Sequence, residues 1–418
     1  MKFVYSFYKF YNIGFKLNIL KECQFKKKCV NLNKCKNLCK KGKFNCFMIY
    51  KDFSYYFRLN IYNIIDKLYY NDKCLFFIYT NEDLNFKTEK ERVMYYTYGL
   101  YNFVKKNEKI FSSSGKKIFY NLRSKMACLD YNDFELHPSY KIMNYDVLNS
   151  IVKNMNDSFF IKRHFKKFLE LITNLKIKKK KIFKVSPYDM AFSCKLCTFC
   201  KSRLIKNKKN SILLPLEDVY LPYKRLEEIK NDIPFEKKQF KVVWRGSNSG
   251  SFDINDVSRG SRRHLVEKYY NDKSKIIDVG ITNFNYNKNY DNKLFLKLKK
   301  KRIEIEDQLK SKFIICVEGN DFPTNLLWVF LSNSVPLMPK PIIDTWFMEG
   351  NLKEWIHYVP LKNDFSDLKE KINYCYNNLK KCKKISINSK LYAIQFLNIN
   401  KENKIINEVI KYYFDNVI

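Results

Sequence analysis

Glycine and proline are scarce in this 418-residue chain, with ten of each, whereas lysine, asparagine, isoleucine, tyrosine and phenylalanine are abundant. An AT-rich genome produces such a composition, so part of the positive charge has a compositional origin. No run of 18 uncharged apolar residues occurs, which argues against a membrane-spanning helix. The first residues are apolar but are interrupted by Lys2, Lys9 and Lys16, so we expect no secretory signal.

The sequence also lacks a regular cysteine framework. Its 13 cysteines are an odd number at irregular spacing, which favours a reducing compartment over a disulfide-built domain, and we expect a cytoplasmic location. Cys194, Cys197 and Cys200 have the spacing C-x2-C-x2-C, but no fourth ligand of a closed zinc site is identifiable. Unligated thiols are the favoured interpretation, and no metal site is predicted.

Positive charge is what the chain has in excess. The formal net charge of +37 is typical of proteins that bind nucleic acid or anionic membranes. Residues 1–50 contain twelve lysines and one glutamate, which gives eleven net positive charges among aromatic and aliphatic residues. Such a segment can hold a protein at the inner face of the cytoplasmic membrane. A solvated or loosely packed extension is the alternative.

Beyond this segment, short apolar runs alternate with amphipathic stretches, which is typical of α/β proteins with parallel sheets. The charged connection 222–238 is the candidate domain boundary. We therefore divide the chain into a basic, Cys- and aromatic-rich extension (1–72), a first lobe (73–238) and a second lobe (239–418). Strands are expected at 74–79, 182–186, 212–216, 240–244, 275–279, 313–317 and 335–338, and helices at 89–105, 145–176, 259–270, 293–310, 324–333, 366–377 and 401–413.

The stretch 312–361 organises the second lobe. The apolar run 313–317 predicts a buried parallel strand, a turn follows at 318–321, and Pro323 stands where the first turn of a helix tolerates it. A helix and a strand at 335–338 complete a βαβ unit. Backbone N–H groups of its turn can hold a phosphate, although the pattern alone favours an ordinary crossover with nothing bound.

Several blocks of sequence resemble a known family. The run Val243-Trp-Arg-Gly-Ser247 is similar to the WRGS signature of the lipopolysaccharide-modifying glycosyltransferases of family 90, which are related to the protein O-glucosyltransferases. The EGND turn at 318–321, the run SNSVPLM at 332–338 and the ending W-I-H-Y-V-P-L at 355–361 also look like that family, as does Lys201-Ser-Arg203. Because separate blocks occur in the family's order, the resemblance is more specific than a lone Gly-rich turn.

The resemblance implies a fold and an activity. The fold is the glycosyltransferase B type, with two Rossmann-like lobes and a cleft between them, in which 73–238 is the acceptor-side lobe and 239–418 binds the nucleotide sugar. The implied enzyme moves glucose, galactose or xylose from a UDP-sugar to a lipopolysaccharide, a lipooligosaccharide or another glycan, with inversion. No further cofactor is expected. Since no Asp-x-Asp metal triad stands at a strand end, arginine side chains are expected to replace a divalent cation at the diphosphate.

The leaving diphosphate needs donors for its negative charge, and a guanidinium offers a planar fork that phosphate oxygens accept in pairs. Arg245 and Arg262 are the candidates, and pairing with a neighbouring carboxylate is the alternative for each. Eukaryotic protein O-glucosyltransferases carry Ser and Arg where this chain has Pro323 and Asn325, so backbone N–H groups and the Asn amide would serve here. The predicted donor-binding residues are Arg245, Gly246, Ser247, Arg262, Gly319, Asn320, Asp321, Thr324 and Asn325.

Asp189 is the predicted catalytic base. An acceptor hydroxyl is a very weak acid, so its attack is helped by a carboxylate within hydrogen-bond reach. Asp189 follows an apolar strand, and relatives carry an Asp at the end of the corresponding strand, in an Arg-Asp-aromatic-Pro context. Here Met190 and Ala191 follow instead. An Asp that caps a turn is the alternative, and Asp321 is the next carboxylate to consider.

Two other functions remain open. A basic nucleic-acid-binding protein without catalytic activity would explain the charge and the 31 tyrosines and 35 phenylalanines. Its lysines, however, are spread over every segment and no recognition motif occurs, so no specific nucleic-acid partner is expected. A catalytically inactive relative that acts as a scaffold would explain the altered surroundings of Asp189.

Overall fold

A computed structural model describes residues 87–98, 143–154, 160–186, 198–206, 208, 211–250, 260–283 and 292–416, together with five strands between residues 6 and 80. These five strands form an antiparallel sheet whose aromatic-rich sequences favour extended structure. The strand order is β1 (Ser6–Phe15), β5 (Leu68–Thr80), β3 (Cys46–Tyr50), β4 (Phe53–Phe57) and β2 (Phe25–Lys28). The predicted extension therefore contains strands, and β5 crosses the predicted boundary at residue 72.

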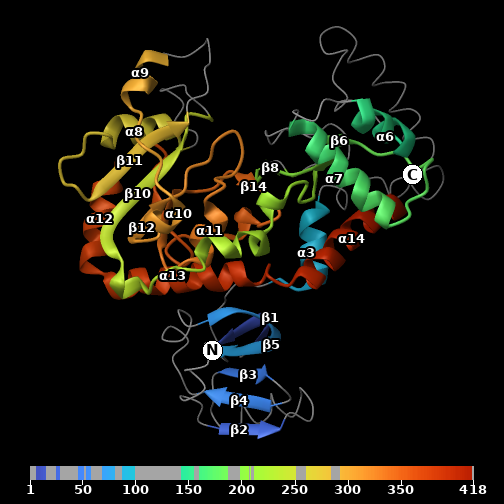
Figure 1. The fold of residues 1–418 in the computed structure, drawn as a ribbon, viewed down its shortest axis with the longest axis horizontal. Helices are drawn as coiled ribbons and strands as arrows, with labels where there is room; N and C mark the ends of the chain where they lie inside the picture. Colours follow the sequence, from blue (N-terminus) through green and yellow to red (C-terminus); the bar gives the residue numbers. More distant parts are fainter. Residues whose placement is uncertain are drawn as a thin grey trace.

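The larger of the parallel sheets is built from the second half of the chain (Figure 1). Its strand order is β11 (Ile277–Asn283), β10 (Gln239–Ser247), β12 (Ser311–Ile315), β13 (Val335–Pro339) and β15 (Val359–Leu361), all parallel. The first strand in sequence, β10, lies between β11 and β12. The direction in which new strands are added therefore reverses between β10 and β12, and ligands of such sheets bind at this point, outside the carboxyl ends of the strands.

Helices cover both faces of this sheet, as its apolar strands require. On one face of the sheet, Phe313, Ile315 and apolar residues of the neighbouring strands pack with α8 (Arg262–Tyr269) and α12 (Leu368–Asn377). Ile314 and Cys316 on the other face belong to the core that contains α11 (Leu326–Leu331) and α13 (Leu379–Ile394). Alternate residues of one strand thus enter two different cores.

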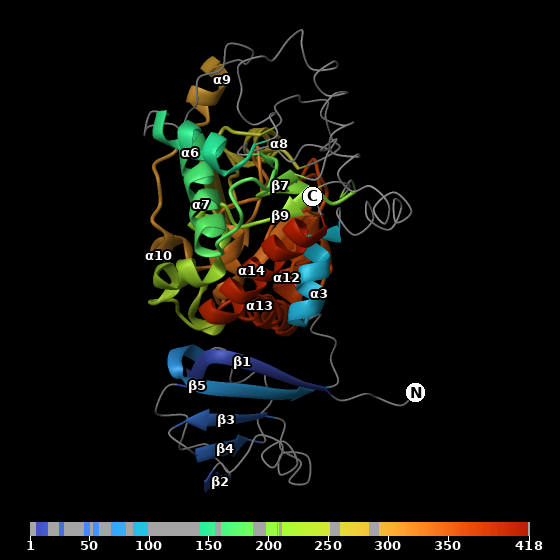
Figure 2. The ribbon, with the colours of Figure 1, turned by 90° about the vertical axis from the view of Figure 1, so that its right-hand side faces the viewer.

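A smaller parallel sheet is formed by β6 (Val185–Ser186), β7 (Thr198–Cys200) and β9 (Ser211–Leu213). Around it lie the helices of the right-hand part of Figure 1, which Figure 2 shows from the side. The last helix, α14 (Ile399–Asn416), packs its Tyr413 ring against Phe199 of β7. The predicted division had assigned this helix to the second lobe. These helices are α3 (Glu89–Tyr96), α6 (Tyr145–Asn154), α7 (Phe160–Asn174) and α14 (Ile399–Asn416), and the short 3-10 helices are η4 (Asp218–Tyr220), η5 (Pro222–Ile229), η6 (Phe235–Lys237) and η7 (Glu349–Asn351).

The predicted α/β class with parallel sheets is confirmed, but one helix prediction is wrong and one helix was not predicted at all. The single helix expected at 293–310 is two short ones, α9 (Asn292–Lys297) and α10 (Ile305–Gln308), because the chain between them pairs with the edge strand β11 through Ile281 and Lys299. Helix α13 was not predicted, because its second half is buried on every side and lacks an amphipathic stripe. Within the described ranges, no helix has the length and apolar composition needed to cross a membrane.

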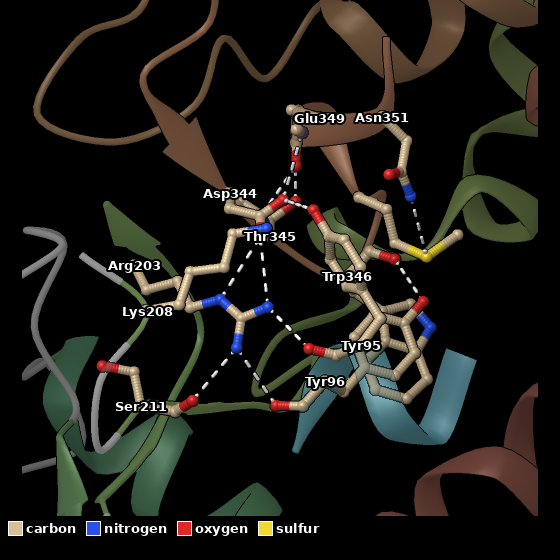
Figure 3. A network of polar contacts seen from close by, with 12 residues as sticks. Tyr95, Tyr96, Arg203, Lys208, Ser211, Asp344, Thr345, Trp346, Glu349 and Asn351 are labelled. Atoms are coloured by element: carbon tan, nitrogen blue, oxygen red, sulfur yellow. Dashed lines mark hydrogen bonds and ion pairs between the residues drawn. The ribbon is translucent and has the colours of Figure 1, made fainter. Parts of the chain in front are cut away.

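A buried polar network joins the two parallel-sheet regions (Figure 3). Strand β8 (Arg203–Leu204) pairs with β14 (Ile343–Asp344), and the Arg203 guanidinium donates to the Asp344 carboxylate at 3.2 Å. Arg203 also donates to the backbone oxygens of Tyr95, Tyr96 and Ser211. Both charged side chains are fully buried, so this network fixes the backbone that leads from β7 to β8.

Candidate functional site

A cavity of about 440 Å³ lies where the two parallel sheets present their carboxyl ends. From the larger sheet it takes residues that follow β10 and β12, which is the point where the strand order reverses. From the smaller sheet it takes Lys201, the first residue after β7. Its lining residues are Arg163, Lys201, Glu217, Val219, Tyr220, Ser247, Ser249, Arg262, Gly319, Asn320, Asp321, Phe322 and Thr324.

Arg262, the first residue of α8, defines one end of the cavity. Its Nη1 donates to the hydroxyls of Ser247 at 2.9 Å and Ser249 at 2.6 Å, and its Nη2 donates to the Val317 carbonyl at 3.4 Å. The guanidinium therefore bridges the carboxyl ends of β10 and β12. This end of the cavity combines a cation with serine hydroxyls, which suits an anionic ligand.

The glycine of the EGND turn lies directly against this arginine. A Cβ on Gly319 would lie 2.7 Å from Arg262 Nη2 and 2.9 Å from Ser249 Oγ, closer than side chains approach one another. Asn320 accepts a hydrogen bond from the Gly250 N–H at 3.0 Å, and Gly250 has a φ of 113°, which only glycine adopts easily. The two loops therefore approach each other through residues without side chains.

The other end of the cavity contains paired charges. The Tyr220 hydroxyl donates to Asp321 Oδ2 at 2.5 Å, and the Phe322 N–H donates to Asp321 Oδ1 at 2.8 Å. Burial raises the pKa of the Asp321 carboxyl, although the Tyr220 hydrogen bond and the Lys201 charge oppose the shift. Lys201 is only 1% exposed and its Nζ lies 3.4 Å from His164 Nε2. Such a buried lysine is retained only where partners surround it.

Glu217 completes this second end. Its Oε1 lies 3.1 Å from His164 Nε2 and 3.5 Å from Arg163 Nη2. Burial alone would raise the pKa of Glu217, but the hydrogen bond and charge of His164, followed by Lys201 and Arg163, lower it overall. This carboxylate is therefore ionised at neutral pH and faces the cavity.

Six of the predicted donor-binding residues line this one cavity: Ser247, Arg262, Gly319, Asn320, Asp321 and Thr324. Asp321 does not serve as a simple helix cap, because Asn325 is the residue at the cap position of α11. The chain thus brings together two of the sequence blocks that carry the family resemblance, the WRGS run and the EGND turn.

Three predicted residues do not line the cavity. The Arg245 guanidinium pairs with Asp278 of β11, and its Nη2 donates to the two carboxylate oxygens at 2.8 and 2.9 Å. Arg245 therefore pairs with a neighbouring carboxylate, which was the alternative considered for it. Gly246 leaves room for the Trp244 ring, which lies 2.6 Å from the position of a Cβ. Asn325 donates its side-chain amide to the Ile315 carbonyl at 2.9 Å and closes the end of β12.

Asp189, the predicted base, lies outside the described residues, as do Cys194 and Cys197 of the cysteine cluster. Cys200 is described: it ends β7, is buried, and its thiol lies 3.7 Å from the Ile212 carbonyl. In the part of the chain that the structure describes, no three His, Cys, Asp or Glu side chains come together as metal ligands do.

Sequence reasoning missed the contribution of the smaller sheet. Arg163, Glu217 and Tyr220 come from a helix and a loop without a motif, and only the tertiary fold brings them to the cavity. Lys201 did carry a signal, because the run Lys201-Ser-Arg203 belongs to the resemblance.

Comparisons with known proteins find similar sequences. The chain is 33% identical over 230 residues to O-glucosyltransferase LpsA of Dichelobacter nodosus, which covers 54% of this chain and 64% of that protein. It is 31% identical over 206 residues to the uncharacterized protein 179R of Invertebrate iridescent virus 6, covering 43% of this chain and 17% of that one. It is 31% identical over 159 residues to protein O-glucosyltransferase 2 of Danio rerio, covering 38% of this chain and 29% of that protein. The chain thus spans less than two thirds of each of these relatives.

A family model matches the same part of the chain. It is described as Glycosyl transferase family 90 and covers residues 214–415, which include β10 to β15, the EGND turn and Arg262. The family resemblance of the sequence blocks is thereby confirmed: residues 214–415 match the model of glycosyltransferase family 90.

Proposed function

We propose that the chain is a glycosyltransferase that moves a sugar from a UDP-sugar to a glycan acceptor with inversion at the anomeric carbon. Glucose, galactose and xylose are the candidate sugars, and a lipopolysaccharide or lipooligosaccharide is the leading acceptor. The observation that carries the proposal is the position of the cavity, at the reversal of strand order between β10 and β12, with Arg262 held between two serines. The fold expected with this function is the two-lobed glycosyltransferase B type.

The diphosphate fits the Arg262 end of the cavity. Its negative charge grows as the bond to the sugar breaks, and a fixed guanidinium with hydroxyl donors stabilises that charge without reorganisation. Arg262 already bridges Ser247 and Ser249, so these donors are oriented before the ligand arrives. We expect this cation to serve in place of a divalent metal, so that chelation by EDTA leaves turnover unchanged. Loss of activity in EDTA with rescue by Mn²⁺ would contradict the metal-free part.

The catalytic base is proposed to be Asp189. It follows β6 by three residues in the sequence, and β6 runs parallel to β7, whose carboxyl end leads to Lys201 in the cavity wall. Carboxyl ends of parallel strands meet at one edge of a sheet. A base that approaches from the smaller sheet, opposite a diphosphate held by the larger one, suits a single inverting displacement.

Replacement of Gly319 by alanine is expected to weaken UDP binding about 10-fold or more, because the added Cβ would push the Arg262 guanidinium away from the serines. Isothermal titration with UDP measures the effect. The melting temperature should change little, since the turn is at the surface of the cavity. Unchanged UDP affinity in the folded variant would show that the position of Arg262 does not matter for the nucleotide.

Deletion of residues 1–50 is expected to release the protein from anionic vesicles while UDP binding persists. Near an anionic surface each lysine contributes about 1 kcal/mol before screening, and the segment carries twelve. Sedimentation with phosphatidylserine vesicles compares the full chain with the truncated one, and neutral phosphatidylcholine vesicles serve as the control. If the truncated protein sediments equally, membrane association does not depend on this segment.

The proposed function itself is tested by a calorimetric screen of UDP-glucose, UDP-galactose and UDP-xylose against the full chain. Binding of one of them, followed by transfer to a lipooligosaccharide acceptor with an inverted anomeric product, is the expected result. Binding without turnover would support the inactive relative. Steeply salt-dependent binding of oligonucleotides without UDP binding would support the nucleic-acid-binding alternative instead.

A further inference from the structure

The two ends of the cavity differ in their charges. At the Arg262 end, the described lining residues Ser247, Ser249 and Gly319 add no carboxylate. At the other end, the cations Lys201 and Arg163 stand with the carboxylates Asp321 and Glu217, so that formal charges balance. A diphosphate is attracted to the first end and is repelled by carboxylates at the second.

The second end has the chemistry that sugar hydroxyls need. A hydroxyl donates one hydrogen bond and accepts others, so it is bound best where carboxylates and ammonium or phenol donors stand side by side. Tyr220 and Lys201 surround Asp321, and all three line the cavity. Because these groups are largely removed from water, a sugar that leaves one of them without a partner loses much affinity.

We propose that the end of the cavity formed by Lys201, Tyr220 and Asp321 is the subsite for the transferred sugar and determines which UDP-sugar is accepted. The inference rests on the proposed function, because it assigns the Arg262 end to the diphosphate. Asp321 accepts a hydrogen bond from a sugar hydroxyl, and Lys201 donates one to a neighbouring oxygen. Asp321 follows β12 of the larger sheet, whereas Lys201 follows β7 of the smaller sheet and Tyr220 belongs to η4. The sugar would therefore contact residues from both sheet regions.

The test compares UDP with UDP-glucose, UDP-galactose and UDP-xylose by isothermal titration to the full chain. Lys201→Met removes the ammonium but keeps a side chain of similar length. We expect UDP affinity within about threefold of the wild type and a loss of about 10–100-fold in affinity for the preferred UDP-sugar. Tyr223→Phe is the matched control for a second variant, Tyr220→Phe, since it too removes a phenol hydroxyl from this region but Tyr223 does not line the cavity.

Tyr220→Phe is the second variant and removes a single oxygen, so it changes the packing less than Lys201→Met does. It should lower UDP-sugar affinity about 2–10-fold relative to UDP, because Asp321 loses one fixed donor. A parallel loss of UDP and UDP-sugar affinity would place Lys201 at the phosphates and overturn the inference. Unchanged affinity for every UDP-sugar in both variants would also overturn it. Failure of the wild type to bind UDP would instead contradict the proposed function.

Discussion

Turnover is expected to fall about 10²–10⁴-fold when Asp189 is replaced by asparagine, which is the usual loss when general-base assistance is removed. Asparagine keeps the size and hydrogen-bonding capacity of the side chain but does not take up the proton of the acceptor hydroxyl. Affinity for UDP and the melting temperature should barely change, because the diphosphate is assigned to Arg262 and the substitution keeps the size of the side chain. Initial rates with the preferred UDP-sugar, measured beside UDP titrations, separate catalysis from binding.

A matched variant sharpens this experiment. Asp321→Asn changes the other candidate carboxylate, which lies in the cavity with its pKa raised by burial. If Asp189 is the base, its variant loses turnover at unchanged UDP affinity, whereas the Asp321 variant alters UDP-sugar affinity. Near-wild-type turnover of Asp189→Asn, together with a collapse in Asp321→Asn, would move the base to Asp321.

The free energy of unfolding is expected to fall by about 3–5 kcal/mol when Arg92 is replaced by methionine. Arg92 of α3 and Glu402 of α14 are both fully buried, and Arg92 Nη2 donates to Glu402 Oε2 at 2.6 Å. Glu402 also accepts from Trp346 Nε1 at 2.7 Å, and that hydrogen bond does not compensate the charge. The variant therefore leaves a carboxylate buried without a cation. Urea unfolding followed by fluorescence measures the loss.

The same two helices supply the control. Lys404 of α14 lies 2.7 Å from Glu89 of α3, with both side chains exposed, so Lys404→Met should cost only about 0–1 kcal/mol. The double variant Arg92→Met/Glu402→Gln should be less destabilised than the sum of the two single variants, because it removes both charges. Equal effects of Arg92→Met and Lys404→Met would show that the buried pair does not hold the helices together.

The larger parallel sheet and half of the cavity were predictable from sequence. Apolar runs at 240–244, 275–279, 313–317 and 335–338 are long enough and bounded by clear turns, and they match β10 to β13. Ser247 and Gly319 follow such strands, and the carboxyl ends of parallel strands come together whatever the details of the helices. The EGND turn was therefore placed correctly beside the WRGS block.

Other parts depended on contacts that no sequence pattern records. Arg245 was expected at the ligand, but its guanidinium pairs with Asp278 of the neighbouring strand. The pairing of β10 with β11 brings these two side chains together. Helix α13 was missed because Ser389 and Lys390 are buried in it, with hydrogen bonds to the His357 carbonyl and to Asn333 respectively. Glu217 reaches the cavity from a loop that only tertiary packing positions.

Titration of UDP into the wild type and into Arg262→Gln tests most directly whether this cavity is a nucleotide-sugar site. Glutamine fills part of the space and keeps a hydrogen-bond donor but removes the positive charge. We expect the wild type to bind UDP in the presence of EDTA and Arg262→Gln to bind it about 10–100-fold more weakly at an unchanged melting temperature. No UDP binding by the wild type, or equal binding by the folded variant, would contradict the assignment of the diphosphate to Arg262.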